Sequence, residues 1–169
     1  MTKFFAQPYD IAACGFYFSD AEGFENQIGK VRKDYGQPVE EFEIQFIDGE
    51  ALDCAFANAW GVNQANVIKF IEALSEWEEH EKLCFIIAVG ECGYSFDPKA
   101  VSAYDFDVDI YEMESLRELA EHFVDEGLFG DIPERISFYL DYDAIARDLG
   151  MDYTETVIPP FLEGRISRI

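Results

Sequence analysis

The sequence has few of the residues from which catalytic and metal-binding sites are most often built. Its two histidines, His80 and His122, have no cysteine or histidine near them at the spacing of zinc ligands. The four cysteines include no Cys-x-x-Cys pair and form no dense disulfide pattern. A glycine-rich phosphate loop and a dinucleotide-binding fingerprint are absent too. The sequence therefore predicts no metal, no cofactor and no enzymatic activity.

Long apolar runs are also absent. The longest run, Leu83–Val89, is far shorter than the roughly 20 residues that a helix needs to cross a membrane. The first residues do not combine a basic start with an apolar stretch, as a secretory signal does. Because scattered cysteines also fit a reducing compartment, we expect a cytoplasmic protein without a membrane partner.

Basic residues are scarce. The chain has 12 Lys and Arg residues against 35 Asp and Glu residues, which gives a formal net charge of −23. Such a field repels nucleic acid and attracts proteins with basic grooves. Because 49% of the residues are hydrophobic and 16% are aromatic, the chain can still build a core. We therefore expect a folded acidic protein that binds another protein and makes no direct contact with nucleic acid.

The first module that the pattern indicates spans residues 1–60. Ser19, with Glu22 three residues later, has the capping-box pattern of a helix start, and Gly36 marks the break after that helix. Short aromatic segments indicate strands at residues 3–6 and 15–18, and alternating apolar residues indicate a third strand at 41–46.

A second module, residues 61–103, reads as mainly helical. A helix is expected from Asn63, and the stretch 76–81 that follows it is acidic with one tryptophan. The apolar run 83–89 fits a buried strand or a buried helix, and its β-branched residues favour a strand.

The third module, residues 104–169, is the most acidic. Aspartates alternate with apolar residues over 105–110, which predicts a strand with one wet face. Ser115 and Glu118 form a capping-box pattern, and Gly127 ends the helix that they begin. One further helix is expected from Asp131, with Ile136, Tyr139 and Leu140 facing inward, and another over 143–149.

A strand at 156–158 and a break at Pro159-Pro160 complete the chain. The predicted fold is an α+β chain of three small modules, in the order sheet plus helix, helical middle, and sheet plus helices.

Carboxylates repeat along one side of several of these elements. On the strand at 105–110 they recur about every 6 to 7 Å, close to the spacing of phosphates along a nucleic-acid strand. On the helix after Ser115 they extend along roughly 16 Å of one face. The predicted partner-binding carboxylates are Glu41, Glu43, Glu78, Glu79, Asp105, Asp107, Asp109, Glu114, Glu118, Glu121 and Asp125.

Two chemical alternatives were tested against the sequence. The aspartates at 105, 107 and 109 open like a calcium loop, but Ile110 stands where glycine is required and Leu116 stands where glutamate is required. Cys92 lies in a glycine turn and could serve as a hydrolase nucleophile, although no histidine is tied to it by a motif.

Three C-terminal segments resemble the ArdA antirestriction proteins: Gly127–Glu134, Phe138–Tyr142 and Ala146–Leu149. Gly15–Phe18 is also similar to the first strand of that family. The resemblance implies an elongated dimer that imitates B-form DNA and occupies the DNA-binding groove of type I restriction-modification enzymes. It also implies that residues 83–89 are helical. The residues that it places at or near the dimer interface are Ile132, Pro133, Ile136, Tyr139 and Tyr142.

Three hypotheses of function follow. The first is a DNA-mimicking antirestriction protein, encoded on a mobile element or phage, that competes with DNA for a restriction enzyme. The second is an acidic adaptor or chaperone for a basic protein, which would use the same surface for another partner. The third is a hydrolase that uses Cys92 or a pair of carboxylates.

Overall fold

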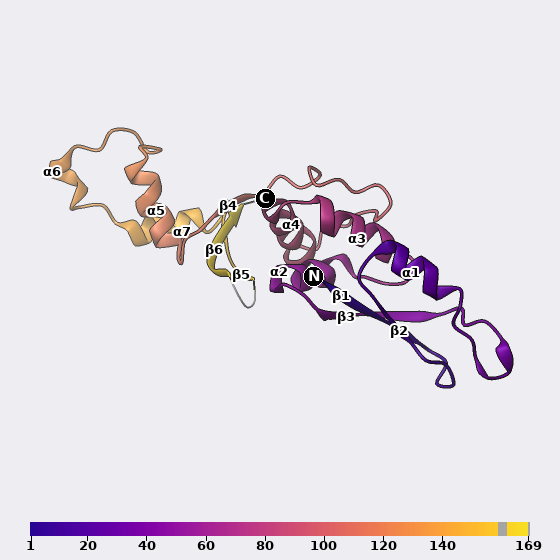
Figure 1. Ribbon diagram of the computed structural model, residues 1–169. Coiled ribbons are helices and arrows are strands. Elements are labelled where there is room, and N and C mark those ends of the chain that lie inside the picture. Colours follow the sequence, from indigo (N-terminus) through magenta and orange to yellow (C-terminus); the bar gives the residue numbers. More distant parts are fainter. Residues whose placement is uncertain (159–161, 169) are drawn as a thin grey trace. The chain divides into compact units, whose positions relative to one another are not determined.

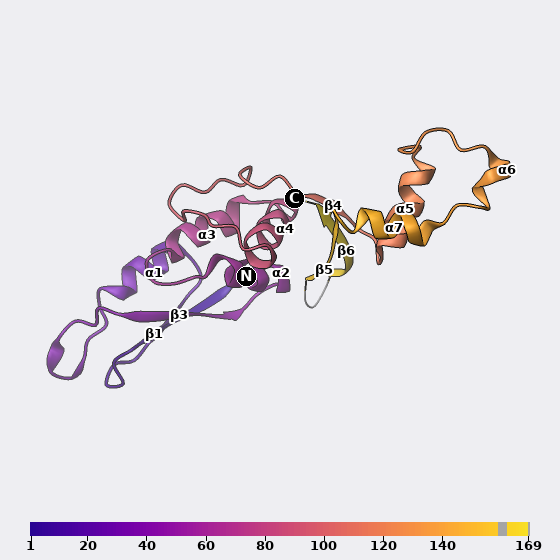
Figure 2. The same cartoon turned by 180° about the vertical axis from the view of Figure 1, so that it is seen from behind.

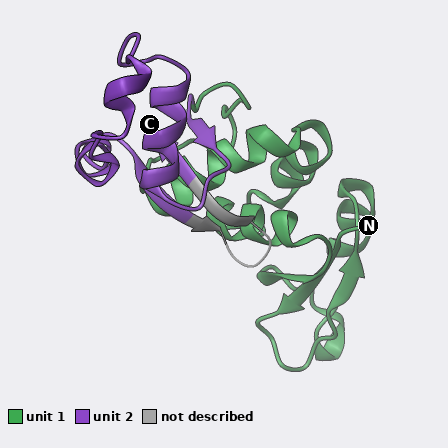
Figure 3. Cartoon of the chain, turned by 90° about the vertical axis from the view of Figure 1, so that its left-hand side faces the viewer, with its two compact units in different colours: residues 1–106 green, residues 107–169 purple. Residues whose placement is uncertain are grey.

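The computed structural model describes residues 1–158 and 162–168 (Figure 1). The chain divides into two compact units, residues 1–106 and residues 107–169 (Figure 3). Each unit contains helices and one three-stranded antiparallel sheet, which confirms the predicted α+β class. The finer division into modules at residues 60 and 103 stays a prediction.

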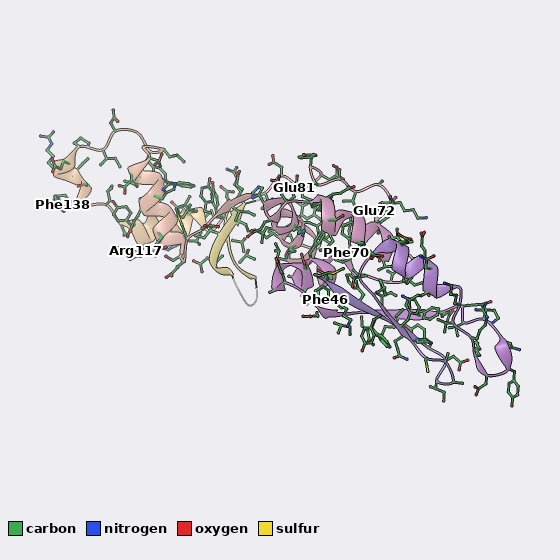
Figure 4. The ribbon with its side chains drawn as sticks, viewed as in Figure 1. Phe46, Phe70, Glu72, Glu81, Arg117 and Phe138 are labelled. Atoms are coloured by element: carbon green, nitrogen blue, oxygen red, sulfur yellow. The ribbon has the colours of Figure 1, made fainter. Side chains whose placement is uncertain are left out.

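The sheet of the first unit has the order β2-β1-β3. Its strands are β1 (Lys3–Pro8), β2 (Phe16–Phe18) and β3 (Phe42–Asp48), close to the three predicted ranges. Phe4 and Ala6 point to the buried face and Phe5 to the other, as the two-residue period of a strand requires. Phe4 contacts the rings of Phe46 and Phe70, so the sheet packs on the helices through aromatic side chains (Figure 4).

Helix α1 (Ala21–Ile28) begins one residue later than the capping-box pattern predicts. The Oδ1 atom of Asp20 accepts the Gly23 N–H at 2.6 Å, so Asp20 and not Ser19 is the N-cap. Aspartate and serine are about equally good N-caps, which is why the sequence did not distinguish them.

Helix α2 (Ala51–Trp60) was not predicted from the sequence. Its buried stripe consists of Asp53, Phe56, Ala57 and Trp60, which have the spacing of one helix face. The stripe begins with a carboxylate, and alanines occupy much of the rest of the helix. Polar and apolar positions are therefore not separated in the sequence, and the periodic signal is weak.

Two further helices follow, α3 (Val67–Glu76) and α4 (Glu79–Phe85), and α4 continues as the π-helix η2 (Ile86–Glu91). The helical structure that the family resemblance implies for residues 83–89 is therefore confirmed, and the strand favoured by local propensity is wrong. Residues 83–88 are all buried. A helix that is apolar on every side is stable when it is covered on every side, and here burial outweighs the β-branched content.

Aromatic rings fill the space among these helices. Trp60 is almost completely buried, and its Nε1 atom has no hydrogen-bond acceptor in the described part of the chain. Most of the rings around it lie at steep angles to the indole plane, an edge-to-face arrangement that aromatic pairs prefer. The ring centroids within 5.8 Å of Trp60 are those of Phe56, Phe70, Trp77, Phe85 and Phe96.

The second unit has a sheet of order β4-β6-β5 and a small core. Its strands are β4 (Asp109–Tyr111), β5 (Thr154–Ile158) and β6 (Leu162–Arg168), and its longer helices are α5 (Leu116–Asp125) and α7 (Tyr142–Leu149). The core cluster consists of Leu119, Phe123, Tyr153 and Ile166. The predicted strand at 156–158 and the predicted helices at 115–127 and 143–149 are confirmed. The predicted break at 159–160 lies outside the described residues.

The predicted strand over 105–110 is wrong for residues 105–108, because β4 begins only at Asp109. Asp109 pairs with Arg168, near the end of β6. Residue 105 instead closes a turn, since its N–H donates to the Ser102 carbonyl and its carboxylate accepts the Ser102 N–H. The alternation of exposed aspartates with more buried apolar residues is nevertheless present over 105–110.

The segment between α5 and α7 forms an open loop, with the four-residue helix α6 (Glu134–Ser137) at its far end (Figures 1 and 2). Gly127, at φ 74°, ends α5, because the N–H groups of Gly127 and Leu128 return to carbonyls of the last helical turn. The inward orientation predicted for Ile136 and Tyr139 is wrong, since these side chains are 47% and 85% exposed. One helical turn is too short to lay an apolar stripe against a core.

One polar contact is buried within the first unit. The Asp53 carboxylate accepts the Thr2 hydroxyl at 2.9 Å and the Lys82 ammonium at 3.1 Å, and the Asp53 and Lys82 side chains are only 13% and 12% exposed. The contact joins the start of the chain, α2 and α4. Since both carboxylate oxygens have partners, the burial of this charge is compensated.

We expect the substitution Lys82→Met to reduce the free energy of unfolding of the first unit by about 3 kcal/mol, because it leaves a buried carboxylate without its cation. Urea unfolding followed by tryptophan fluorescence measures this loss, since Trp60 and Trp77 both lie in this unit. The control is Lys69→Met, which breaks the exposed Lys69–Glu72 pair and should leave the urea midpoint unchanged. Equal losses in both variants would contradict the compensating role of Lys82.

Candidate functional site

The predicted acidic residues of the first unit lie on its surface. Glu41 precedes β3 and Glu43 lies on it, and both are exposed. Glu78 and Glu79 begin α4 and are exposed as well. Further exposed carboxylates, Glu72 on α3 among them, were not in the predicted set, because an isolated glutamate on a helix gives no signal beyond ordinary solubility (Figure 4).

Several of these carboxylates also make internal hydrogen bonds. Glu78 and Glu81 form a capping box at the start of α4, where the Glu81 carboxylate accepts the Glu78 N–H at 2.7 Å. Glu43 accepts a hydrogen bond from the Gln45 side chain at 2.9 Å. A carboxylate at a helix N-terminus satisfies a backbone donor and stabilises the helix dipole, so these acids have a structural role whatever they bind.

The first unit also contains a pocket of about 170 Å³ between α3 and residues 98–101. Its lining includes Lys69, whose ammonium is 2.6 Å from the Glu72 carboxylate, and no histidine or cysteine among the described residues. The histidine contact that the structure shows joins His80 Nε2 to the buried Cys84 sulfur at 3.5 Å, whereas Cys92 is exposed. The pocket therefore gives no support to a hydrolase that uses Cys92.

In the second unit the acidic residues begin with Asp107 and Asp109, which are both exposed. Asp109 is the backbone partner of Arg168 in the β4–β6 ladder. The Arg168 guanidinium also lies 5.6 Å from the centre of the Tyr153 ring. Burial raises the pKa of the neighbouring Tyr111 phenol above its ordinary value, and Tyr153 and Asp109 add to this shift.

The helix face predicted to be acidic is present on α5, on the side opposite the buried Leu119 and Phe123. Ser115 is the N-cap, and its hydroxyl accepts the Glu118 N–H at 3.3 Å. The Glu118 carboxylate accepts the Glu114 N–H at 2.9 Å, so it satisfies a backbone donor just before the helix. Glu114, which precedes the helix, and Asp125, at its end, are exposed.

Arg117 lies on α5 and pairs with one carboxylate of this acidic face (Figure 4). Its Nε is 3.1 Å from the Glu121 carboxylate and its Nη1 is 2.7 Å from that of Asp143, at the start of α7. These hydrogen bonds, the Asp143 bond above all, raise the pKa of the Arg117 guanidinium above its ordinary value. Glu121 is therefore partly neutralised, and α5 is tied to α7. The sequence did not indicate Asp143, because only the tertiary structure brings it to α5.

The loop from Glu126 to Asp141 exposes large apolar side chains as well as charged ones. Among the residues predicted at the dimer interface, Pro133, Ile136 and Tyr139 are exposed, and Ile132 and Tyr142 are half-buried. The structure adds three exposed apolar residues that the prediction did not include, Leu128, Phe129 and Phe138, of which Phe138 is 86% exposed and lies near α6 (Figure 4). Clustered exposed apolar side chains are typical of interaction sites.

The comparison with known proteins decides the family. The model of the antirestriction protein (ArdA) family matches residues 16–160. The chain belongs to the ArdA antirestriction family. The resemblance noted on the C-terminal segments and on the first strand is therefore confirmed. No curated protein matches the chain.

Membership in the ArdA family implies an antirestriction function and gives the acidic surface a biological context. Within residues 1–158 and 162–168, no cluster of histidine, cysteine or acidic side chains is arranged to hold a metal ion. Over the same residues, no helix of this ArdA chain is long and apolar enough to cross a membrane. The described surface thus presents two features to a partner. Both units expose carboxylates, and the second unit has a loop with exposed apolar side chains.

In this ArdA chain we expect Asp143→Asn to reduce the hydrogen-exchange protection of the α7 amides about twofold to fivefold, because it breaks the contact with Arg117. The control is Asp148→Asn near the C-terminal end of the same helix, which removes the same charge where the helix dipole disfavours it and should not reduce protection. In the background Arg117→Gln, the effect of Asp143→Asn should become smaller. An undiminished effect there would mean that Asp143 acts through the helix dipole alone.

Proposed function

We propose that the chain imitates DNA and competes with it for the DNA-binding groove of a type I restriction-modification enzyme. The observation that carries the proposal is the net charge of −23, displayed as exposed carboxylates on folded elements of both units in a member of an antirestriction family. A groove that neutralises phosphates with Lys and Arg side chains meets carboxylates in their place.

The amount of charge is sufficient for such competition. Duplex DNA carries one charge per roughly 1.7 Å of helix axis, so two chains of −23 carry as much charge as about 46 phosphates, or roughly 80 Å of duplex. The effective number is lower, because Glu121 and Asp143 pair with Arg117. Exposed ion pairs are screened by salt, and inhibition should weaken as the salt concentration rises.

The proposal includes a dimer that forms through the loop from Glu126 to Asp141. What supports it is the exposure of Phe138 and Tyr139, at 86% and 85%. The loop carries few basic residues, so it cannot form many ion pairs with the acidic residues of a second copy. Two acidic chains repel each other, so their contact has to rest mainly on apolar surface. Aromatic side chains are the residues most enriched at the centres of such contacts.

The decisive experiment titrates the purified chain into a type I enzyme and a labelled DNA substrate at low and at high salt. We expect inhibition at low salt that falls steeply at high salt. Inhibition independent of salt, or none with any type I enzyme, would rule out the mimic. Capture of ribosomal or histone-like proteins in place of restriction subunits would favour the acidic adaptor.

Charge removal tests which carboxylates contribute. The four substitutions Glu43→Gln, Glu79→Gln, Glu114→Gln and Asp125→Asn should together raise the concentration for half-inhibition about tenfold, while each alone changes it less than about threefold. These residues are exposed, and their side chains form no ion pair in the described structure. A single substitution that abolished inhibition would show that one contact, and not a distributed field, determines binding.

The dimer is tested by Tyr139→Asp, which should give a monomer in sedimentation velocity because it places a charge within the apolar contact. The fold should survive, since the Tyr139 side chain is 85% exposed in the single chain. Tyr104→Asp is the control, because Tyr104 is 86% exposed and lies outside the loop. A Tyr139→Asp variant that stayed dimeric would place the contact elsewhere.

A further inference from the structure

The loop between α1 and β3, residues 29–38, has the opposite charge to the rest of the chain. It contains three of the 12 basic residues, Lys30, Arg32 and Lys33, and one acidic residue, Asp34. Figures 1 and 2 both show it extending beyond the end of α1, away from the helices α2 to α4 of the same unit. It is therefore a small basic projection on the first unit.

Tyr35, in the middle of this loop, is fully exposed and strained. Its side chain has 102% relative exposure, and its backbone has φ 71° and ψ 13°. Among the described non-glycine residues it alone has a positive φ. A bulky residue in that region is an outlier, and glycine would adopt the same conformation without strain. The exposed Tyr35 side chain packs on no other part of the described chain, so this conformation is held by the backbone of the loop.

The loop is nevertheless well held. The Lys33 N–H donates to the Gln37 carbonyl at 2.7 Å, and the Gly36 N–H donates to the Lys33 carbonyl at 3.0 Å. The Lys33 ammonium is 3.3 Å from the Asp10 carboxylate. The Ala12 N–H and Lys33 together lower the pKa of Asp10 below its ordinary value, which keeps this anchor ionised. The loop therefore presents Tyr35 in a fixed position.

These contacts leave particular groups available to a partner. Lys33 is engaged by Asp10, and one terminal nitrogen of Arg32 donates to the carbonyls of Gly29 and Val31 at 2.7 and 2.9 Å. The Lys30 ammonium makes no ion pair or hydrogen bond in the described structure. The loop therefore carries an exposed aromatic ring and two cations, Lys30 and Arg32, that form no ion pair in the described structure.

We propose that the 29–38 loop binds a carboxylate-bearing protein surface on the restriction enzyme, beside the basic groove that the acidic surface occupies. Tyr35 packs against that surface and Lys30 pairs with an acidic side chain. This inference rests on the proposed function and deepens it. A uniformly acidic molecule has no preferred register in a basic groove, whereas one element of opposite charge fixes the register and rejects wrong partners.

A protein surface fits the loop better than nucleic acid does. Binding to a phosphate backbone requires several cations, because affinity grows with the number of phosphates neutralised. Here only two cations lack an ion-pair partner in the described structure, Asp34 is adjacent to Tyr35, and the chain as a whole carries −23. Tyrosine with a few flanking charges is, by contrast, typical of protein–protein contacts.

The test uses Lys30→Gln and Tyr35→Gly in the full chain, assayed for inhibition of a type I enzyme that the unmodified chain inhibits. Lys30→Gln makes the chain more acidic, so a purely electrostatic mimic should inhibit better, whereas the proposed contact predicts weaker inhibition. The double variant should need about a tenfold higher concentration for half-inhibition. Tyr35→Gly should not lower the urea midpoint, because glycine relieves the strained φ.

The controls are Lys99→Gln, an exposed lysine that makes the same change in charge, and Tyr104→Gly. Neither should weaken inhibition. Unchanged or improved inhibition by the double variant would overturn the proposal while leaving the mimic intact. Binding of labelled duplex DNA by the unmodified chain, lost in Tyr35→Gly, would assign the loop to nucleic acid and also overturn it. Failure of the unmodified chain to inhibit any type I enzyme would remove the proposed function, and this inference with it.

Discussion

Repulsion among 35 acidic side chains is the constraint under which every element of this chain folds. The chain has 12 basic residues, too few to pair with all of these carboxylates. Several acids are therefore stabilised by backbone donors in place of cations. Asp20, Glu78, Glu118 and Asp141 all accept N–H groups at helix starts, where the helix dipole also favours negative charge. The acidic residues thus stabilise the helices that they cap, while their mutual repulsion destabilises the compact fold.

The remaining stability comes from apolar burial. In the first unit, the rings around Trp60 and Phe85 pack three helical elements together, and Phe4 extends this packing to the sheet. In the second unit, a smaller core of Leu119, Phe123, Tyr153 and Ile166 is supplemented by the link from Arg117 to Asp143. Few cations are present, and two of them, Lys82 and Arg117, join elements that are distant in the sequence.

The use of carboxylates as helix caps also limits which of them can bind a partner. A carboxylate that caps a helix can meet a basic groove only with the part of its charge and hydrogen-bonding capacity that the backbone leaves free. The acids best suited to imitate phosphates are the exposed ones without internal partners, such as Glu79 and Asp125. Two large exposed side chains, Tyr35 and Tyr139, lie on loops that differ from the acidic surface. The loop of Tyr35 is basic, and the loop of Tyr139 exposes several apolar side chains. In the proposed function one contacts the enzyme and the other contacts a second copy.

The sequence by itself determined the α+β class, the ArdA family, the acidic excess and the elements whose signals are local. The helix after Ser115 and its end at Gly127 are of that kind, because a side-chain cap and a positive φ depend on a few neighbouring residues. The tertiary structure decided what depends on distant partners. It made the run 83–89 helical by burying residues 83–88, and it allowed β4 to begin only at Asp109, opposite the end of β6. It also placed Asp143 beside Arg117 and left Ile136 and Tyr139 in solvent, since burial and ion pairing are decided by which elements meet in space.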